Sequence, residues 1–94
     1  MLRAQFVRTL RKIGDIAIPE GHARRNKGVT TYFFDNAKLE QVEHLLTEQG
    51  LQNKGQPSYW VAGTTWWENA DGSCRILRHL DNGWFAIALI RWPA

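Results

Sequence analysis

The sequence predicts an α+β domain of two layers, in which two helices pack on an antiparallel or mixed sheet of four or five strands. Apolar side chains recur at helical spacing in residues 2–13 and 35–49. In the second half, β-rich segments are separated by hairpin-turn sequences at residues 70–72 and 82–83. The chain has 94 residues, a length typical of one domain. We therefore expect a single domain over residues 1–94 with the order α-β-β-α-β-β-β.

The first helix is predicted over residues 2–13. Its apolar side chains fall within one narrow arc at about 100° per residue: Leu2, Phe6, Leu10 and Ile13. Gly14 ends it. This segment is rich in Arg and lacks acidic residues, as mitochondrial transit peptides do, but it also lacks their serines. We interpret it as part of the fold, with a mitochondrial address as the alternative.

Residues 15–34 predict two extended segments. Residues 15–19 form a short strand or extended piece that Pro19 ends, and residues 20–28 form a polar, basic loop. Residues 29–34 are β-branched and aromatic, which predicts a strand.

A second helix is predicted from Asp35 or Asn36, either of which suits an N-cap, to about residue 49. Its apolar seam consists of Leu39, Val42, Leu45 and Leu46. Gly50 suits the position after the helix, and Leu51 is expected to fold back onto the last turn. Residues 52–58 are polar and are expected to form a connector.

Three strands are then predicted at residues 59–68, 73–81 and 84–92. A two-residue turn at Asn82-Gly83 would pair Leu80 with Phe85, Arg78 with Ile87, Ile76 with Leu89, His79 with Ala86, Leu77 with Ala88 and Arg75 with Ile90. A three-residue loop at residues 70–72 would align Trp66 with Ile76 and Trp67 with Arg75. A slip of one residue in this hairpin would exchange the faces of the two tryptophans.

This register assigns side chains to two faces of the sheet. The first face, expected to be the core beneath the second helix, carries Trp60, Ala62, Trp66, Ile76, Leu80, Phe85, Ile87 and Leu89. The second carries Trp67, Arg75, Leu77, His79, Trp84, Ala86, Ala88, Ile90 and Trp92, with Gly63 nearby. Because residues 84–92 are apolar on both faces, something must cover the second face as well. The alternatives are the N-terminal helix, a second copy of the chain in a homodimer, or a small molecule above the alanine floor.

Catalytic and metal-binding patterns are weak in this sequence. His22, His44 and His79 lack metal-ligand spacing, so we predict no metal and no cofactor. The single cysteine, Cys74, lies next to Arg75 and is interpreted as a packing residue. We predict no enzyme, and a polar cleft containing His79 and a carboxylate would be the sign against that prediction. One cysteine and no long apolar run predict a cytoplasmic protein without a membrane partner.

Charge is uneven along the chain, whose net charge is +3. Residues 1–30 hold seven basic and two acidic residues, a net +5, and the remaining residues carry a net −2. A basic surface of this kind can contact phosphates. The candidate residues for single-stranded nucleic acid, the alternative function, are Arg8, Arg11, Lys12, Arg24, Arg25 and Lys27.

The function predicted from the sequence is a non-enzymatic binding or protein-interaction module that uses the Trp-rich second face. The expected partner is another protein or a second copy of the chain, with a small molecule or nucleic acid as alternatives. The candidate binding residues are Trp67, Arg75, His79, Trp84 and Trp92. The tryptophans would supply most of the contact energy, because large aromatic side chains dominate binding hot spots.

Overall fold

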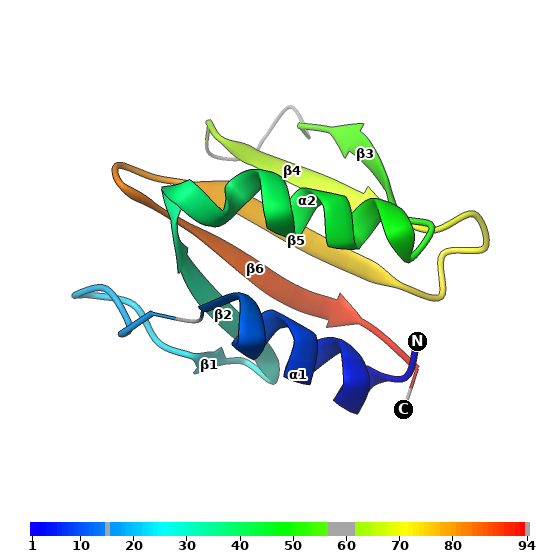
Figure 1. The fold of residues 1–94 in the computed structure, drawn as a ribbon, viewed down its shortest axis with the longest axis horizontal. Coiled ribbons are helices and arrows are strands. Elements are labelled where there is room, and N and C mark those ends of the chain that lie inside the picture. The colour runs from blue at the N-terminus through cyan, green and yellow to red at the C-terminus, as the bar shows by residue number, and fades with distance from the viewer. Residues whose placement is uncertain (15, 57–61, 94) are drawn as a thin grey trace.

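The structure is a computed structural model that describes residues 1–14, 16–56 and 62–93. Within these residues a six-stranded antiparallel sheet carries helices α1 (Arg3–Gly14) and α2 (Leu39–Glu48) on the same face (Figure 1). The strands are β1 (Arg25–Asn26), β2 (Val29–Asp35), β3 (Gln52–Gly55), β4 (Thr64–Glu68), β5 (Arg75–Leu80) and β6 (Trp84–Arg91). Across the sheet their order is β1-β2-β6-β5-β4-β3. The predicted α+β class is therefore confirmed.

The strand count differs from the predicted four or five because of the two edges of the sheet. β1 and β3 come from segments predicted as a polar loop and a polar connector, and both are exposed along their whole length. Edge strands without a buried face show no apolar alternation, so the residue pattern offers no means of finding them. Residues 16–19, predicted as a strand or extended piece, lie outside the sheet, although Ile16 donates a backbone hydrogen bond to Phe33 (2.8 Å).

The first helix buries its predicted stripe against the sheet. Phe6, Leu10 and Ile13 are buried, and Phe6 stacks on Trp92 with ring centroids 4.0 Å apart. Leu2, predicted as part of the stripe, precedes the helix and is 58% exposed. α1 therefore covers the same sheet face as α2, and the idea that it covers the second face is wrong.

The second helix ends as the sequence predicts, whereas the predicted cap, Asp35, begins a 3-10 turn that precedes α2. The Asp35 carboxylate accepts a hydrogen bond from the Ala37 backbone N–H (2.9 Å) and begins a 3-10 turn, Asn36–Lys38, that leads into α2. After the helix, Gly50 has φ of +79°, a conformation that favours glycine. The buried Leu51 then donates its backbone N–H to Leu46 (3.0 Å).

The β5–β6 hairpin has the predicted register except at its open end. The pairs of Leu80, His79, Arg78, Leu77 and Ile76 are all as expected from the Asn82-Gly83 turn. Arg75, however, pairs with Arg91 rather than Ile90, so two residues of β6 face one of β5. Such a bulge interrupts the alternation of side chains. Trp92 consequently turns to the helix side, and its predicted place on the second face is wrong.

The β4–β5 hairpin is shifted by one residue from the predicted register. Trp66 pairs with Leu77 and Trp67 with Ile76. The cause is Asn69, whose backbone N–H donates to the Cys74 carbonyl (3.2 Å) and whose side-chain oxygen accepts from the Cys74 N–H (3.0 Å). These bonds make a four-residue loop in place of the predicted three.

The shift exchanges the two tryptophans between faces. Trp67 is 6% exposed and lies in the core, whereas Trp66 lies half-buried on the other face. Ala62, also predicted in the core, is exposed, and Trp60 lies outside the described residues. The core beneath the two helices contains Phe6, Leu10, Ile13, Tyr32, Phe34, Val42, Leu45, Leu46, Leu51, Trp67, Ile76, Phe85, Ile87, Leu89 and Trp92.

Candidate functional site

The sheet face opposite α1 and α2, called the open face below, has small residues at its centre. Two rows of paired residues cross it from β2 to β4: Thr31, Ala88, Leu77 and Trp66 in one, and Phe33, Ala86, His79 and Thr64 in the other. In both rows the residue on the central strand β6 is alanine, and its neighbours are larger. The result is a hollow of about 500 Å³ with Ala86 and Ala88 in its lining.

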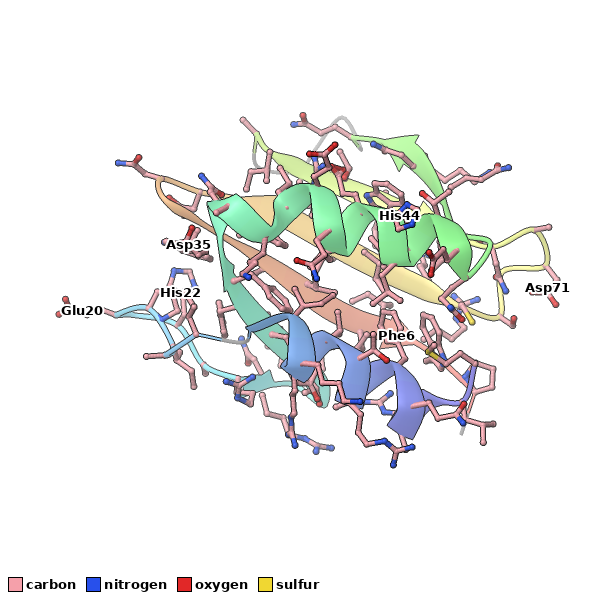
Figure 2. The ribbon with its side chains drawn as sticks, in the orientation of Figure 1. Phe6, Glu20, His22, Asp35, His44 and Asp71 are labelled. Atoms are coloured by element: carbon pink, nitrogen blue, oxygen red, sulfur yellow. The ribbon has the colours of Figure 1, made fainter. Side chains whose placement is uncertain are left out.

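Aromatic rings close one end of the hollow. The Trp84 ring meets Phe33 edge to face (5.8 Å between centroids) and His22 in the same manner (4.9 Å). His22 belongs to the loop that precedes β1, and Figure 2 places it beside the end of β2 marked by Asp35. Gly21, His22 and Ala23 all line the hollow. This loop thus covers part of the open face, a role that the sequence suggested for a helix or a partner.

Thr64 and His79 line the other side of the hollow, and Asp81, which lies outside the lining, contacts His79 in turn. His79 Nδ1 is 2.9 Å from Thr64 Oγ1, and His79 Nε2 is 3.6 Å from Asp81 Oδ2. A histidine beside a carboxylate is the sign of catalysis that the sequence led us to look for. However, Thr64 is only 4% exposed, and 3.6 Å exceeds a hydrogen-bond distance. The arrangement therefore orients the His79 ring and presents no accessible nucleophile.

Three other polar side chains of the hollow are available for hydrogen bonds to a ligand. His22, Asn26 and Thr31 make no side-chain hydrogen bond to another residue in the described ranges. They come from the loop, β1 and β2, on the β1 side of the floor. Imidazole, amide and hydroxyl groups together offer both donors and acceptors to a bound molecule.

The structure brings only two of the five predicted binding residues to the hollow, His79 and Trp84. Arg75 lies on the open face but beyond the hollow, with its guanidinium 3.6 Å from the centroid of the Trp66 ring. Its Nε is 3.3 Å from Glu68 Oε2, a charge contact that lacks hydrogen-bond geometry. Trp67 and Trp92 are in the core, so neither belongs to this surface.

Sequence reasoning missed most of the lining. The alternation in residues 29–34 does put Thr31 and Phe33 on one side, but nothing local shows that β2 pairs with β6. Asn26 and His22 come from a segment with no periodic pattern. Thr64 begins a strand whose register depends on Asn69.

The six predicted nucleic-acid residues lie in two segments that the fold brings together. Arg11 of α1 and Arg24, just before β1, both lie over the Tyr32 ring, with their guanidinium carbons 6.0 and 5.3 Å from its centroid. Arg24 also donates a hydrogen bond to the Thr31 carbonyl (3.3 Å). The other four side chains are exposed: Arg8, Lys12, Arg25 and Lys27.

The described residues give little support to a metal site, a membrane-spanning helix or a reactive cysteine. Residues 1–14, 16–56 and 62–93 hold no group of three or more His, Cys, Asp or Glu side chains placed to bind a metal ion. Among the described helices, none has the length and apolar character needed to cross a membrane. Cys74 is a free, half-buried thiol that packs against the core.

Comparison of the chain with known protein families, with curated proteins and with solved structures found no match. A function is therefore inferred from the geometry of this chain alone.

Proposed function

We propose that the protein is a non-enzymatic binding module whose ligand or partner occupies the hollow on the open face. The observation that carries the proposal is the hollow itself, with alanines in its floor, aromatic rings at one end and uncommitted polar groups at its rim. Its volume of about 500 Å³ is in the range of small-molecule sites. A mostly apolar lining with a few convergent polar groups is also typical of such sites.

Binding is favoured over catalysis by the state of the polar groups. Thr64 is buried and already faces His79, so it is not placed to attack a substrate. His79 is held between Thr64 and Asp81, which suits a residue that shapes a pocket wall. The proposal places the protein in the reducing cytoplasm, because its single cysteine is free.

Fragment screening by NMR tests the proposal. Small molecules that bind should shift the indole N–H of Trp84 and the methyl groups of Ala86 and Ala88, which all line the hollow. The Trp67 indole, buried in the core, is the internal control and should keep its position. Shifts that gather elsewhere on the molecule would contradict the proposal.

A second copy of the chain is the alternative occupant of the open face. Light scattering over a range of concentrations would detect a dimer. In that case Ala88→Arg should dissociate it, because the substitution puts a charge in the middle of the interface. Ala70→Arg, which changes an exposed loop residue in the same way, should leave the dimer intact.

A second candidate function is the binding of single-stranded nucleic acid at the basic end. The convergence of Arg11 and Arg24 on Tyr32 favours it, since it joins two basic segments into one surface. A labelled oligonucleotide should then bind with an affinity that falls steeply with salt. Replacing Arg25 and Lys27 by Gln should lower the slope by about 0.7 for each phosphate that these side chains neutralise. Lys54→Gln, at the opposite edge, should change nothing.

A further inference from the structure

The described residues that line the hollow carry no permanent charge. Among its described lining residues none is Lys, Arg, Asp or Glu. Its apolar surface comes from Phe33, Leu77, Trp84, Ala86 and Ala88. A charged ligand group placed here would lose its hydration and gain no opposite charge, which is unfavourable.

The hollow is also shaped as a slot. Phe33 and His79 flank Ala86 in one row, and Thr31 and Leu77 flank Ala88 in the next. The walls therefore rise from β2 and β5, which lie on either side of β6 and so about 10 Å apart. Ala86 and Ala88, two positions apart on β6, place their methyl groups on this face between the two walls. A slot with methyl groups on its floor fits a planar ring system.

The polar groups lie on one side of this floor. Asn26 and Thr31 come from β1 and β2, and His22 from the loop over them, and these three side chains have no hydrogen bond to another described residue. On the β5 side, by contrast, His79 already faces Thr64. A ligand therefore meets three hydrogen-bonding side chains along the β1–β2 edge, and on the β5 side only His79, whose Nδ1 already faces Thr64.

We propose that the hollow binds an uncharged, planar heteroaromatic molecule, with its rings over Ala86 and Ala88 and its hydrogen-bonding edge toward Asn26 and Thr31. This inference rests on the proposed function and adds the chemical class of the ligand. The Trp84 ring and the His22 ring close the end of the slot against the edge of the bound rings.

A set of three probes with the same bicyclic frame tests the charge requirement. Quinoline is neutral, protonated 6-(aminomethyl)quinoline is a cation and quinoline-6-carboxylate is an anion, and all three keep the ring nitrogen as a hydrogen-bond acceptor. Quinoline should bind at least about tenfold more tightly than either ion, a difference of about 1.4 kcal/mol. Binding is measured by NMR titration of the Trp84 indole N–H and the Ala86 and Ala88 methyl groups, which also reports where each probe lies.

Two variants locate the binding. Ala88→Leu fills the floor and should weaken quinoline binding by about tenfold or more, whereas Ala70→Leu on the exposed loop should leave it unchanged. Thr31→Val removes a hydroxyl with little change in shape. It should weaken quinoline binding by a few-fold, since a hydrogen bond contributes about 0.5–1.5 kcal/mol, or about two- to tenfold.

The outcomes separate the two proposals. Preferred binding of quinoline in the hollow supports both. An ion that binds the hollow as tightly as quinoline overturns the ligand class and leaves the proposed function standing. If none of the three probes shifts the hollow residues, or if a second copy of the chain covers them, the ligand class and the small-molecule form of the function both fail.

Discussion

The two faces of the sheet differ most clearly along the central strand β6. Its helix-facing residues Phe85, Ile87 and Leu89 are large and almost wholly buried, and they form the middle of the core. Two of its residues on the open face, Ala86 and Ala88, are small and line a hollow that Trp84 closes at one end. Alternation of large and small side chains on one strand therefore creates a packed layer and a recess from the same eight residues.

Two arginines of β5 also differ between the two faces of the sheet. Arg78 points to the helix side, is 9% exposed and forms an ion pair with Glu43 of α2 (3.0 Å). Arg75 points to the open face, where its guanidinium lies over the Trp66 ring. The first ties a helix to the sheet, whereas the second covers an aromatic ring that no helix reaches.

The largest expected effect comes from adjacent tryptophans on opposite faces. Trp67→Ala empties a core position and should lower the free energy of unfolding by about 3–5 kcal/mol. Trp66→Ala removes a half-buried ring and its interaction with Arg75, so it should cost about 1–2 kcal/mol. Urea denaturation of both variants gives the difference. Equal losses of stability would show that the open face is packed as firmly as the core.

The next effect concerns the two ion pairs of β5. Glu43→Gln leaves the buried Arg78 without its counter-charge and should cost about 1–3 kcal/mol. Glu68→Gln, next to Arg75 on the open face, should cost less than about 1 kcal/mol. Thermal unfolding compares them at low and high salt, and the pair with the more exposed partners should respond more to salt. A larger destabilisation by Glu68→Gln than by Glu43→Gln would mean that the ion pair on the open face contributes more to stability than the one beneath α2.

Asn69 determines which tryptophan faces which side. Asn69→Ala removes the bonds to Cys74 and Ser73 and should cost about 1–2 kcal/mol. Ser73→Ala removes the hydroxyl's interactions with the Asn69 amide, with Asp71 and with Cys74 Sγ, but it keeps the bonds between Asn69 and Cys74 and should cost less. Denaturation curves followed by tryptophan fluorescence measure both. An Asn69→Ala variant with unchanged stability would mean that the four-residue loop is set by other interactions.

The smallest effect is expected at Asp71 in the same loop. The Ser73 hydroxyl, and after it the Ser73 backbone N–H, lowers the pKa of Asp71 below its ordinary value. The carboxylate thus stabilises the fold above its ordinary pKa, and this contribution is lost as the pH falls through the lowered pKa. The stability advantage of the wild type over Asp71→Asn should therefore shrink in acid. Thermal unfolding of both proteins at about pH 7 and about pH 2 measures this difference in stability. A difference that does not change with pH would contradict a lowered pKa of Asp71.

The sequence correctly predicted the elements that are set by residues close together in the chain. The Asn82-Gly83 turn determined most of the β5–β6 register, Asp35 caps the 3-10 turn that leads into α2, and Gly50 and Leu51 marked the end of that helix correctly. These features depend on bonds between residues close in the chain, so the residue types suffice to predict them.

Features set by side-chain bonds or distant pairing were not predictable in this way. One hydrogen-bonded Asn lengthened a loop by a residue and exchanged Trp66 with Trp67, and one bulge turned Trp92 to the core. The expectation that small residues floor the open face was confirmed for Ala86 and Ala88. Gly63, which was also expected near this floor, packs against Leu80. A Cβ at position 63 would lie 2.9 Å from the Leu80 carbonyl oxygen, so glycine is required there.

The edges of the sheet have a consequence for behaviour at high concentration. Strands with free backbone donors and acceptors can recruit other chains and start aggregation. Here β1 has two residues, and β3 has four with a register shift and a lysine, Lys54. Short, irregular and charged edges offer a poor template for a foreign strand. The molecule can thus leave an apolar sheet face uncovered by helices while its edges resist edge-to-edge pairing with other chains.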